Sequence, residues 1–300
     1  CWSGICTVSR MVDAVLHTTL HEFNRSRLRP SAPGSFTSES FELELTRQTR
    51  HLRREHEFLA SERETVRREL ALVPRDAASF MEWFEDLKQT GPGQNDELFP
   101  WLAHEASWDE MKWFLAQEVA GEAGFDDLVA LTQLQLPQRA KLELARNYWD
   151  EMGRGKAGGM HGPMLAHLAR QLRLPNVPIV SEAVALGNLM MALGCNRTFA
   201  YQSLGALGVI ELTAPGRAAL VNAGLKRLGA TADVRRYYAI HATLDVEHSK
   251  AWNSEVLEPL VSENPELAPV IAEGALLRLH AGRRCFESYR EFLWRRAAER

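Results

Sequence analysis

Cysteine is scarce in this 300-residue chain, with four residues at positions 1, 6, 195 and 285. They form no Cys-x-x-Cys pair and their spacing offers no disulfide framework, so we expect a reducing, cytoplasmic setting. No apolar run reaches the roughly 18 residues that a membrane-spanning helix needs, so we expect no membrane association. The opening residues, CWSGICTVSR, lack a charged region followed by a long apolar run, so we expect no signal peptide. We expect residues 1–10 to lie outside the functional unit, as tag or upstream sequence.

A strong charge of either sign is also missing. The chain has 35 Lys and Arg against 39 Asp and Glu, a formal net charge of -4 with His neutral. It shows no basic face with interleaved aromatic side chains, so we expect no nucleic-acid partner. The basic runs at 50–54 and 295–300 stand beside acidic residues and are typical of solvated helix faces.

Signals for β-strands are weak, with few alternating β-branched runs and no hairpin dipeptide between two apolar runs. Apolar residues instead recur at helical spacing, and 45% hydrophobic content is enough to bury a large core. A Pro/Ser/Gly linker covers 26–37, and Ser107 with Glu110 three residues later forms a capping box. We predict helices at 38–72, 77–88, after Ser107, at 137–152, 161–175, 181–194, 198–212, 217–228, 231–257, 265–283, and from there to the C-terminus.

These elements predict an all-α fold, in which metal sites form between facing helices of a bundle. We divide the chain into an N-terminal segment and linker, 1–37, and a single helical domain, 38–300. The site described next falls within 95–255 of that domain.

The most informative pattern is His241-x3-Asp245-x2-His248. On an α-helix these positions lie within a narrow angular range, so two imidazoles and a carboxylate line one stripe. A buried stripe of this kind would be costly without hydrogen-bond partners or a metal ion. The ligand set suits a transition metal such as iron, and manganese is a rival on ligand type alone.

Four further residues of the same chemistry lie upstream: Glu118, Glu151, His161 and Glu211. Four carboxylates and three histidines match the needs of two metal ions better than one. The competing interpretations are a solvent-facing Glu118 and an exposed helix end for Glu211, each a common fate of a glutamate.

Glycines separate Glu151 from His161 in the segment GRGKAGGMHG. The segment is no phosphate-binding loop, because no strand precedes it and the Gly-Lys-Ser/Thr ending is missing. We predict that the glycines let the chain fold back, so that His161 approaches Glu151.

The ordered set Glu, Glu-x9-His, Glu, then His-x3-Asp-x2-His resembles the haem-oxygenase-like diiron oxidases and oxygenases, a family of iron-containing redox enzymes. The stretches KLELARNYWDEMGRGKAGGMH and PWLAHEASWDEMKWFLAQEVAGEAGFDDLVAL are very similar to that family. The resemblance covers roughly residues 95–255. It implies a bundle of about seven core helices, here with an N-terminal helical extension. It also implies two Fe ions that activate O2 as cosubstrate, with no haem.

The resemblance also implies roles for the residues. Glu118, His161 and His248 would serve one iron, Glu211, His241 and Asp245 the other, and Glu151 would bridge them. Family reactions include amine N-oxygenation, oxidative decarboxylation to an alkene and C–C cleavage of amino acids. We therefore expect a small-molecule substrate, most simply an amino-acid-derived amine of specialised metabolism. An external electron donor and a homodimer are compatible with this interpretation.

Three alternatives remain open at this point. A metal-free, thiaminase-like hydrolase on the same fold would use Cys195 or Cys285 as nucleophile. A haem-binding oxygenase would use His17 or His21, and a non-catalytic helical binding protein would use none of these residues. Near the site, Asn147 lies one turn before Glu151 and could hydrogen-bond it. Residues that could line a pocket or support the site are Arg146, Tyr148, Trp149, Arg197 and Tyr201.

Overall fold

Residues 2–35 and 37–298 are described by the computed structural model, with side chains for 13–35 and 37–295. These residues form helices, and extended pairing among them is limited to an isolated bridge between Met152 and Met160. The predicted all-α class is thus confirmed. The α-helices are α1 (Trp2–Arg27), α2 (Ser38–Leu70), α3 (Ala77–Thr90), α4 (Leu98–His104), α5 (Trp108–Gly121), α6 (Phe125–Thr132), α7 (Gln138–Glu151), α8 (His161–Leu172), α9 (Ser181–Cys195), α10 (Ala200–Arg227), α11 (Arg236–Trp252), α12 (Glu258–Glu263) and α13 (Leu267–Ala298). Short turns of other helical types are η1 (Gly153–Gly155), η2 (Ala157–Gly159), η3 (Arg197–Phe199) and η4 (Asn253–Leu257).

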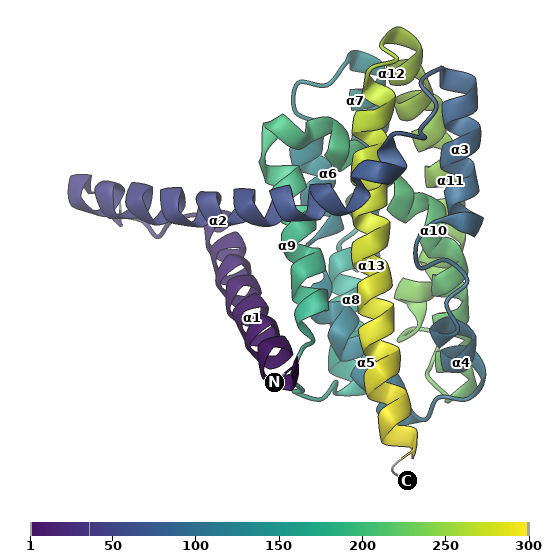
Figure 1. Ribbon diagram of the computed structural model, residues 1–300. Coiled ribbons are helices and arrows are strands. Elements are labelled where there is room, and N and C mark those ends of the chain that lie inside the picture. The colour runs from purple at the N-terminus through teal and green to yellow at the C-terminus, as the bar shows by residue number, and fades with distance from the viewer. Residues whose placement is uncertain (1, 36, 299–300) are drawn as a thin grey trace.

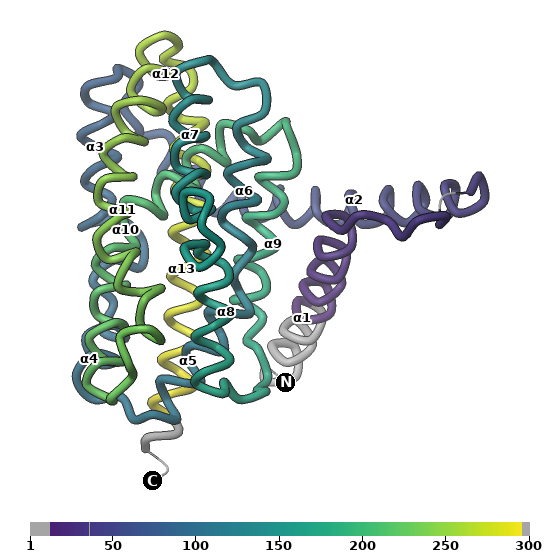
Figure 2. The backbone as a smooth tube through the Cα atoms, turned by 180° about the vertical axis from the view of Figure 1, so that it is seen from behind, coloured from purple at the N-terminus to yellow at the C-terminus, as the bar shows by residue number. Residues whose placement is uncertain are grey.

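The bundle is built around α10, which packs against α4, α11 and α13. Figures 1 and 2 show α13 running along the bundle, with α3, α4, α10 and α11 to one side and α8 and α9 to the other. Apolar residues surround α10 on nearly all sides, as expected of a helix at the centre of a core. This central helix carries one acidic residue, Glu211, which is only 2% exposed.

Glycines allow α10 and α13 to approach each other closely. A Cβ added to Gly205 would lie 1.8 Å from the carbonyl oxygen of Ile271, and one on Gly274 would lie 1.7 Å from that of Gln202. Both distances are far below any van der Waals contact, and each obstacle is backbone rather than a movable side chain. The two helices therefore meet at a spacing that only glycine permits.

Most predicted helices are confirmed, and the start of α5 shows why. The Ser107 hydroxyl accepts a hydrogen bond from the Glu110 amide, while the Glu110 carboxylate accepts one from the Ser107 amide at 2.8 Å. This is the capping box that the sequence predicted.

The prediction of two helices on either side of Pro215 is wrong, because α10 continues through that residue. Inside a helix, proline removes the hydrogen bond to the carbonyl four residues earlier, here that of Glu211, and its ring crowds the same carbonyl. The packing of α10 on α11 and α13 outweighs these costs. The C-terminal pair of predicted helices is likewise one helix, α13. The triplet helix begins later than expected, at Arg236.

The expectation that no segment is long and apolar enough for a membrane also needs correction. The helical stretch Arg197–Arg227 meets both criteria by length and composition. Its most apolar window is 61% buried inside the bundle, so core packing already accounts for its apolar character.

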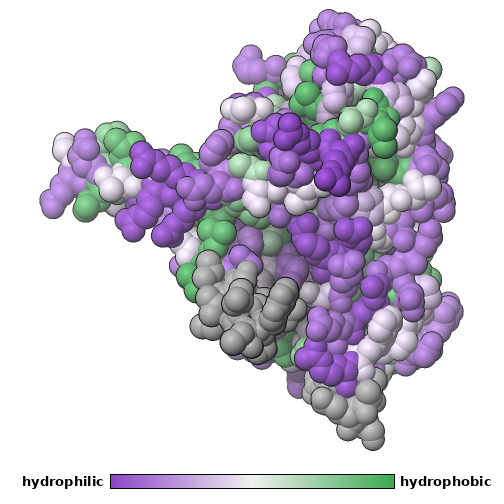
Figure 3. Space-filling view, viewed as in Figure 1, coloured by the Kyte–Doolittle hydropathy of each residue, from purple (hydrophilic) through white to green (hydrophobic). Residues whose placement is uncertain are grey.

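The N-terminal helices form an arm beside the bundle. Helix α1 packs on α9, where Asn24 donates a hydrogen bond to Asn188 at 2.9 Å. Helix α2 lies on α13 at one end and projects away at the other (Figure 1). Hydrophobic surface appears on the projecting part in Figure 3, where Phe41 and Leu43 are 46% and 67% exposed.

The domain boundary at residue 37 stays a prediction. Residue 1 and the side chains of 2–12 lie outside the described part, so the expectation for residues 1–10 also stays open.

The glycine contact between α10 and α13 gives a stability prediction. Gly274→Ala should lower the free energy of unfolding by about 1–3 kcal/mol, because its methyl group would overlap the Gln202 backbone. Gly216→Ala, in α10 with open space around it, should leave stability unchanged or raise it by up to about 1 kcal/mol. Urea unfolding followed by circular dichroism measures both. Equal stability of the two variants would show that the helices can move apart without cost.

Candidate metal centre

A glycine turn joins the end of α7 to the start of α8. Gly153 has φ 62°, and a Cβ there would lie 2.4 Å from the carbonyl carbon of Gly159, so the turn requires glycine at that position. The turn reverses the chain and pairs Met152 with Met160. It thereby brings Nδ1 of His161 to 2.7 Å from Oε2 of Glu151. The prediction that the glycines fold the chain back is confirmed.

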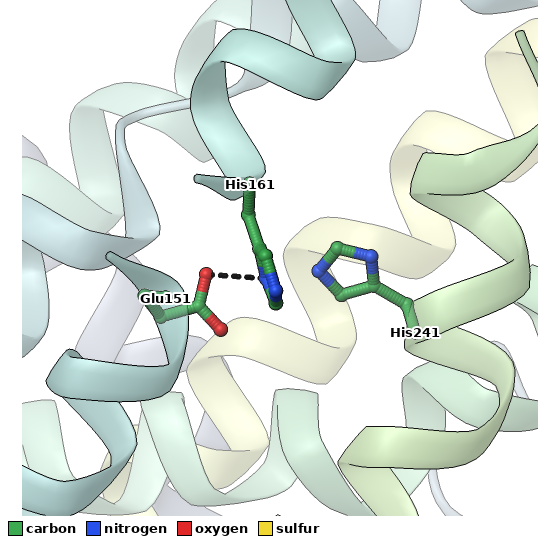
Figure 4. Close-up of side chains that lie close together, drawn as sticks. All are labelled: Glu151, His161 and His241. Atoms are coloured by element: carbon green, nitrogen blue, oxygen red, sulfur yellow. Dashed lines mark ion pairs between the residues drawn. The ribbon is translucent and has the colours of Figure 1, made fainter. Parts of the chain in front are cut away.

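Glu151, His161 and His241 form the first of two clusters, which we call cluster A. Figure 4 shows the three side chains converging from α7, α8 and α11. Their ligand atoms lie within 4.8 Å of one another, and the two imidazole rings are 4.6 Å apart between centroids. Nδ1 of His241 lies 2.7 Å from the Tyr237 carbonyl oxygen, which acts as acceptor and leaves Nε2 free to bind a metal.

Glu211, Asp245 and His248 form cluster B, again with ligand atoms within 4.8 Å of one another. They come from α10 and α11, and all three are buried. His248 places Nδ1 3.5 Å from Oε2 of Glu211 and Nε2 3.2 Å from Oδ2 of Asp150. The hydrogen bond to Asp150 orients the ring and leaves Nδ1 directed at the cluster.

Two supporting residues differ from the sequence analysis. Asn147 was expected to hydrogen-bond Glu151, but its amide donates to Oε1 of Glu211 at 2.6 Å. Asp150 was not predicted at all. Its position about 100° from Glu151 on the helix indicated a different direction, and the structure shows that this direction leads to His248 of cluster B.

The other residues named near the site do not line the cavity that borders it. Arg146 pairs with Glu143 at 2.9 Å, and Trp149 is 53% exposed. Arg197 donates hydrogen bonds to backbone carbonyls at the end of α6, including that of Thr132 at 3.0 Å. Tyr201 packs at the edge of the hydrophobic core, as does Tyr148.

The structure groups the predicted ligands differently from the assignment to two irons that the resemblance implies. His241 joins Glu151 and His161, whereas His248 joins Glu211 and Asp245. Glu118 is in neither cluster, although it lines the same cavity as Glu151 and Glu211. It is nonetheless no solvent-facing residue, since it is half-buried and lines this cavity. Burial raises its pKa, opposed by the charge of Arg278 and a hydrogen bond from Tyr289.

The carboxylates and imidazoles perturb one another strongly. Burial, and next the charge of Glu211, raises the pKa of Asp245. Burial and the neighbouring His161 lower the pKa of His241 to about 4. Burial also lowers the pKa of His248, but its contacts with Glu211 and Asp150 outweigh that effect and raise the pKa to about 9. Perturbations of this size in a buried cluster are typical of functional sites.

The arrangement fits bound metal ions. Nδ1 of His161, Oδ1 of Asp245 and Nδ1 of His248 are buried without a hydrogen-bond partner among the described residues. Nδ1 of His161 and Oε2 of Glu151, 2.7 Å apart, are therefore close enough for a hydrogen bond but are not aligned to form one. Two ligands held about 2.1 Å from one ion at right angles lie about 3 Å apart, as these atoms nearly do. A cation in each cluster would satisfy the unpaired atoms and offset the repulsion between carboxylates.

Comparison with known proteins supports this chemistry. Residues 112–283 match the sequence profile of the family described as iron-containing redox enzymes. The chain belongs to that family. The match spans both clusters and Glu118, so iron is the metal that the family implies for this iron-containing redox enzyme. No curated protein is significantly similar to the chain.

The fold is shared with solved structures. Two crystal structures of a CADD-like protein of unknown function from Nostoc punctiforme superpose with TM-scores of 0.58 and 0.54. Sequence identity is 16% in both, over 72% of this chain and 98% and 95% of the other. The predicted haem-oxygenase-like bundle is thereby confirmed. At this identity the likeness concerns the fold alone.

The geometry also bears on the cysteine and haem alternatives. Burial raises the pKa of the Cys195 thiol, and burial and Glu118 raise that of Cys285 to about 12. Neither cysteine is therefore an activated nucleophile. His17, on α1, packs edge-on against Phe58 of α2, outside the cavity that borders the clusters.

That cavity has a volume of about 190 Å³. Cluster residues, among them Glu151, Glu211 and Asp245, line one part of it. The remaining wall is mostly apolar, but it also carries four charged side chains, Glu118, Glu122, Arg217 and Arg278. A small molecule in this cavity would contact both the clusters and these charged groups.

The position of Asp150 predicts its effect on metal binding. Asp150→Ala should weaken one metal site about tenfold to a hundredfold, because it removes the group that orients His248. Asp233→Ala is the matched control, since Asp233 pairs with His167 at 2.6 Å outside both clusters. Anaerobic Fe(II) titration measures both variants. Wild-type affinity at both sites in Asp150→Ala would mean that the bundle alone orients His248.

The raised pKa of Cys285 predicts an unreactive thiol. With a pKa of about 12, only about one thiol in ten thousand is ionised at pH 8, and the thiolate is the reactive form. Iodoacetamide at pH 8 should therefore leave Cys285 unlabelled in the native protein and label it in 8 M urea, as read by peptide mass spectrometry. Rapid labelling of Cys285 in the native protein would restore the cysteine-based hydrolase as a candidate.

Proposed function

We propose that this chain is a non-haem diiron enzyme that activates O2 to oxidise a small metabolite. The observation that carries the proposal is that two clusters of imidazole and carboxylate ligands, buried except for the half-buried His241, border one cavity. The six ligands fall into two separate groups of three, each with its ligand atoms within 4.8 Å of one another, so each group can hold one ion. The charges of Glu151 and Glu211 both act on Asp245, which indicates that the clusters adjoin.

Glu151, His161 and His241 would hold one iron, and the three residues of cluster B would hold the other. Bound iron would supply redox electrons and open coordination positions for O2. Family membership favours iron over manganese, which the donor atoms alone would also accept.

The chain's own residues orient the ligands and shape the site. The Tyr237 carbonyl fixes the His241 ring, Asp150 fixes the His248 ring, and Asn147 fixes the Glu211 carboxylate. The ring of Tyr237 also lies 4.3 Å from that of His241, between centroids. Burial raises the pKa of Tyr237 far above its usual range, so its hydroxyl stays neutral and can donate a hydrogen bond into the cavity.

For the reaction itself, we propose N-oxygenation or oxidative cleavage of an amino-acid-derived amine. The support for this finer statement is the resemblance to diiron oxidases and the small cavity, about 190 Å³, with both acidic and basic side chains in its wall. A cavity of this size suits a compact metabolite, and its charged side chains can bind the polar groups of that metabolite.

Iron counting tests the proposal. After anaerobic loading, we expect about two irons per chain and rapid consumption of O2 on mixing. His161→Ala should lose mainly the iron of cluster A, and His248→Ala mainly that of cluster B. Glu151→Ala should weaken both sites if this carboxylate bridges the ions, as the resemblance implies.

His167→Ala is the matched control, because His167 is on α8 like His161 but pairs with Asp233 instead. It should keep both irons. Recovery of one iron or none from the wild-type protein at saturating Fe(II) would contradict the diiron assignment.

A further inference from the structure

The cavity wall contains a charged group that neither cluster uses. Arg278, on α13, lines the cavity together with Glu118 and Arg217. Among the described residues it donates no hydrogen bond and makes no ion pair within 4.0 Å. A guanidinium group offers five N–H donors in a fixed planar fork, so this arginine brings unused hydrogen-bonding capacity to the cavity.

The neighbouring charged groups are already engaged. Glu122 accepts backbone hydrogen bonds from Gly124 at 2.9 Å and Phe125 at 3.2 Å, and so caps the start of α6. Glu118 is held by a hydrogen bond from Tyr289. The charges of both carboxylates act on Arg278, but neither forms an ion pair with its guanidinium within 4.0 Å.

Arg217 differs from Arg278 in being fixed by the protein. It donates to Gln94 at 3.3 Å and Thr213 at 3.2 Å. Its guanidinium also lies 5.8 Å from the ring centroid of Phe99 and 5.6 Å from that of Phe286. Burial, and then the charge of Arg278, lowers the pKa of Arg217 to about 10, which places two like charges near each other inside the bundle. The charge of Glu118 opposes this effect on Arg217, so two acidic and two basic side chains share the cavity wall, and Arg278 is the basic one whose N–H donors are unused.

We infer that Arg278 recognises the carboxylate of an organic-acid substrate in this cavity. This inference rests on the proposed function and specifies the substrate class of that site. A carboxylate matches the guanidinium fork with two parallel hydrogen bonds, which a single-point donor such as lysine does not reproduce. A phosphate dianion fits less well, because Glu118 and Glu122 face the same cavity and would repel a second negative charge.

The rest of the cavity sets the shape of such a substrate. Phe114, Leu186, Met190 and Ile210 supply apolar wall, and the cluster residues close another part of the cavity. An acid anchored at Arg278 would lay its carbon chain along this wall, with carbons remote from the carboxylate nearest the clusters. Both a simple carboxylic acid and an α-amino acid carry the required group.

Calorimetric titration of the anaerobic, iron-loaded protein tests the inference. The probes are hexanoate and L-norleucine, which share a carboxylate, and hexanamide, hexylamine and hexyl phosphate, which do not. We expect at least one of the two acids to bind, and hexanamide to bind about tenfold or more weakly than that acid, because it lacks the charge. Which acid binds more tightly distinguishes a simple acid from an amino acid.

Arg278→Gln should weaken binding of that acid about tenfold to a hundredfold and leave hexanamide binding unchanged. Arg278→Lys keeps the charge without the fork, so its affinity should lie between the two. Arg284→Gln is the matched control on the same helix, since Arg284 pairs with Glu62 away from the cavity. It should bind the acids as the wild type does.

Several outcomes would overturn the inference. One is that the wild type and both Arg278 variants bind the acids with equal affinity. Another is that hexylamine or hexyl phosphate binds more tightly than both acids. The third is that the wild type binds neither acid. Iron counting on the same samples separates the two proposals. Arg278→Gln should retain its iron. A wild-type protein without two irons would contradict the diiron assignment, and the acid affinities of the wild type and the Arg278 variants would still decide whether Arg278 binds a carboxylate.

Discussion

Three carboxylates share the interior of this bundle with three imidazoles, and the repulsion among the carboxylates is the constraint that its other features serve. Burial raises the pKa values of Glu151 and Asp245, and the carboxylate of Glu211 raises both further. Hydrophobic packing must hold these groups together until cations balance them. The close glycine contact of α10 with α13 fits that need, because it fixes the helix that carries Glu211.

Helical spacing predicted which residues would face inward. The separation of His241, Asp245 and His248 by four and three residues places them on one stripe whatever the helix packs against. The glycines between Glu151 and His161 likewise predicted a reversal, because a side chain at Gly153 would overlap the returning backbone. Local rules of this kind made the ligand types and the all-α fold accessible from the sequence.

Contacts between distant segments were not accessible in the same way. Which histidine joins which carboxylate depends on the rotation of α11 against α7 and α10, and periodicity along one helix does not determine that rotation. Arg278 gave no signal either, because it is one of 35 basic residues and only the meeting of α5, α10 and α13 places it in the cavity. Pro215 misled for a related reason, since burial against other helices outweighed its local preference.

The last turn of α7 links the two clusters mechanically. Glu151 contributes to cluster A, while Asp150 and Asn147 hold His248 and Glu211 of cluster B. Consecutive positions on a helix point about 100° apart, so a single turn can reach both clusters only if it lies between them. A displacement of this turn would therefore disturb both sites at once, and the Gly153 turn that follows restricts such a displacement. The supporting residues thus belong to one rigid element, which explains why two clusters built from four helices can keep a fixed relation to each other.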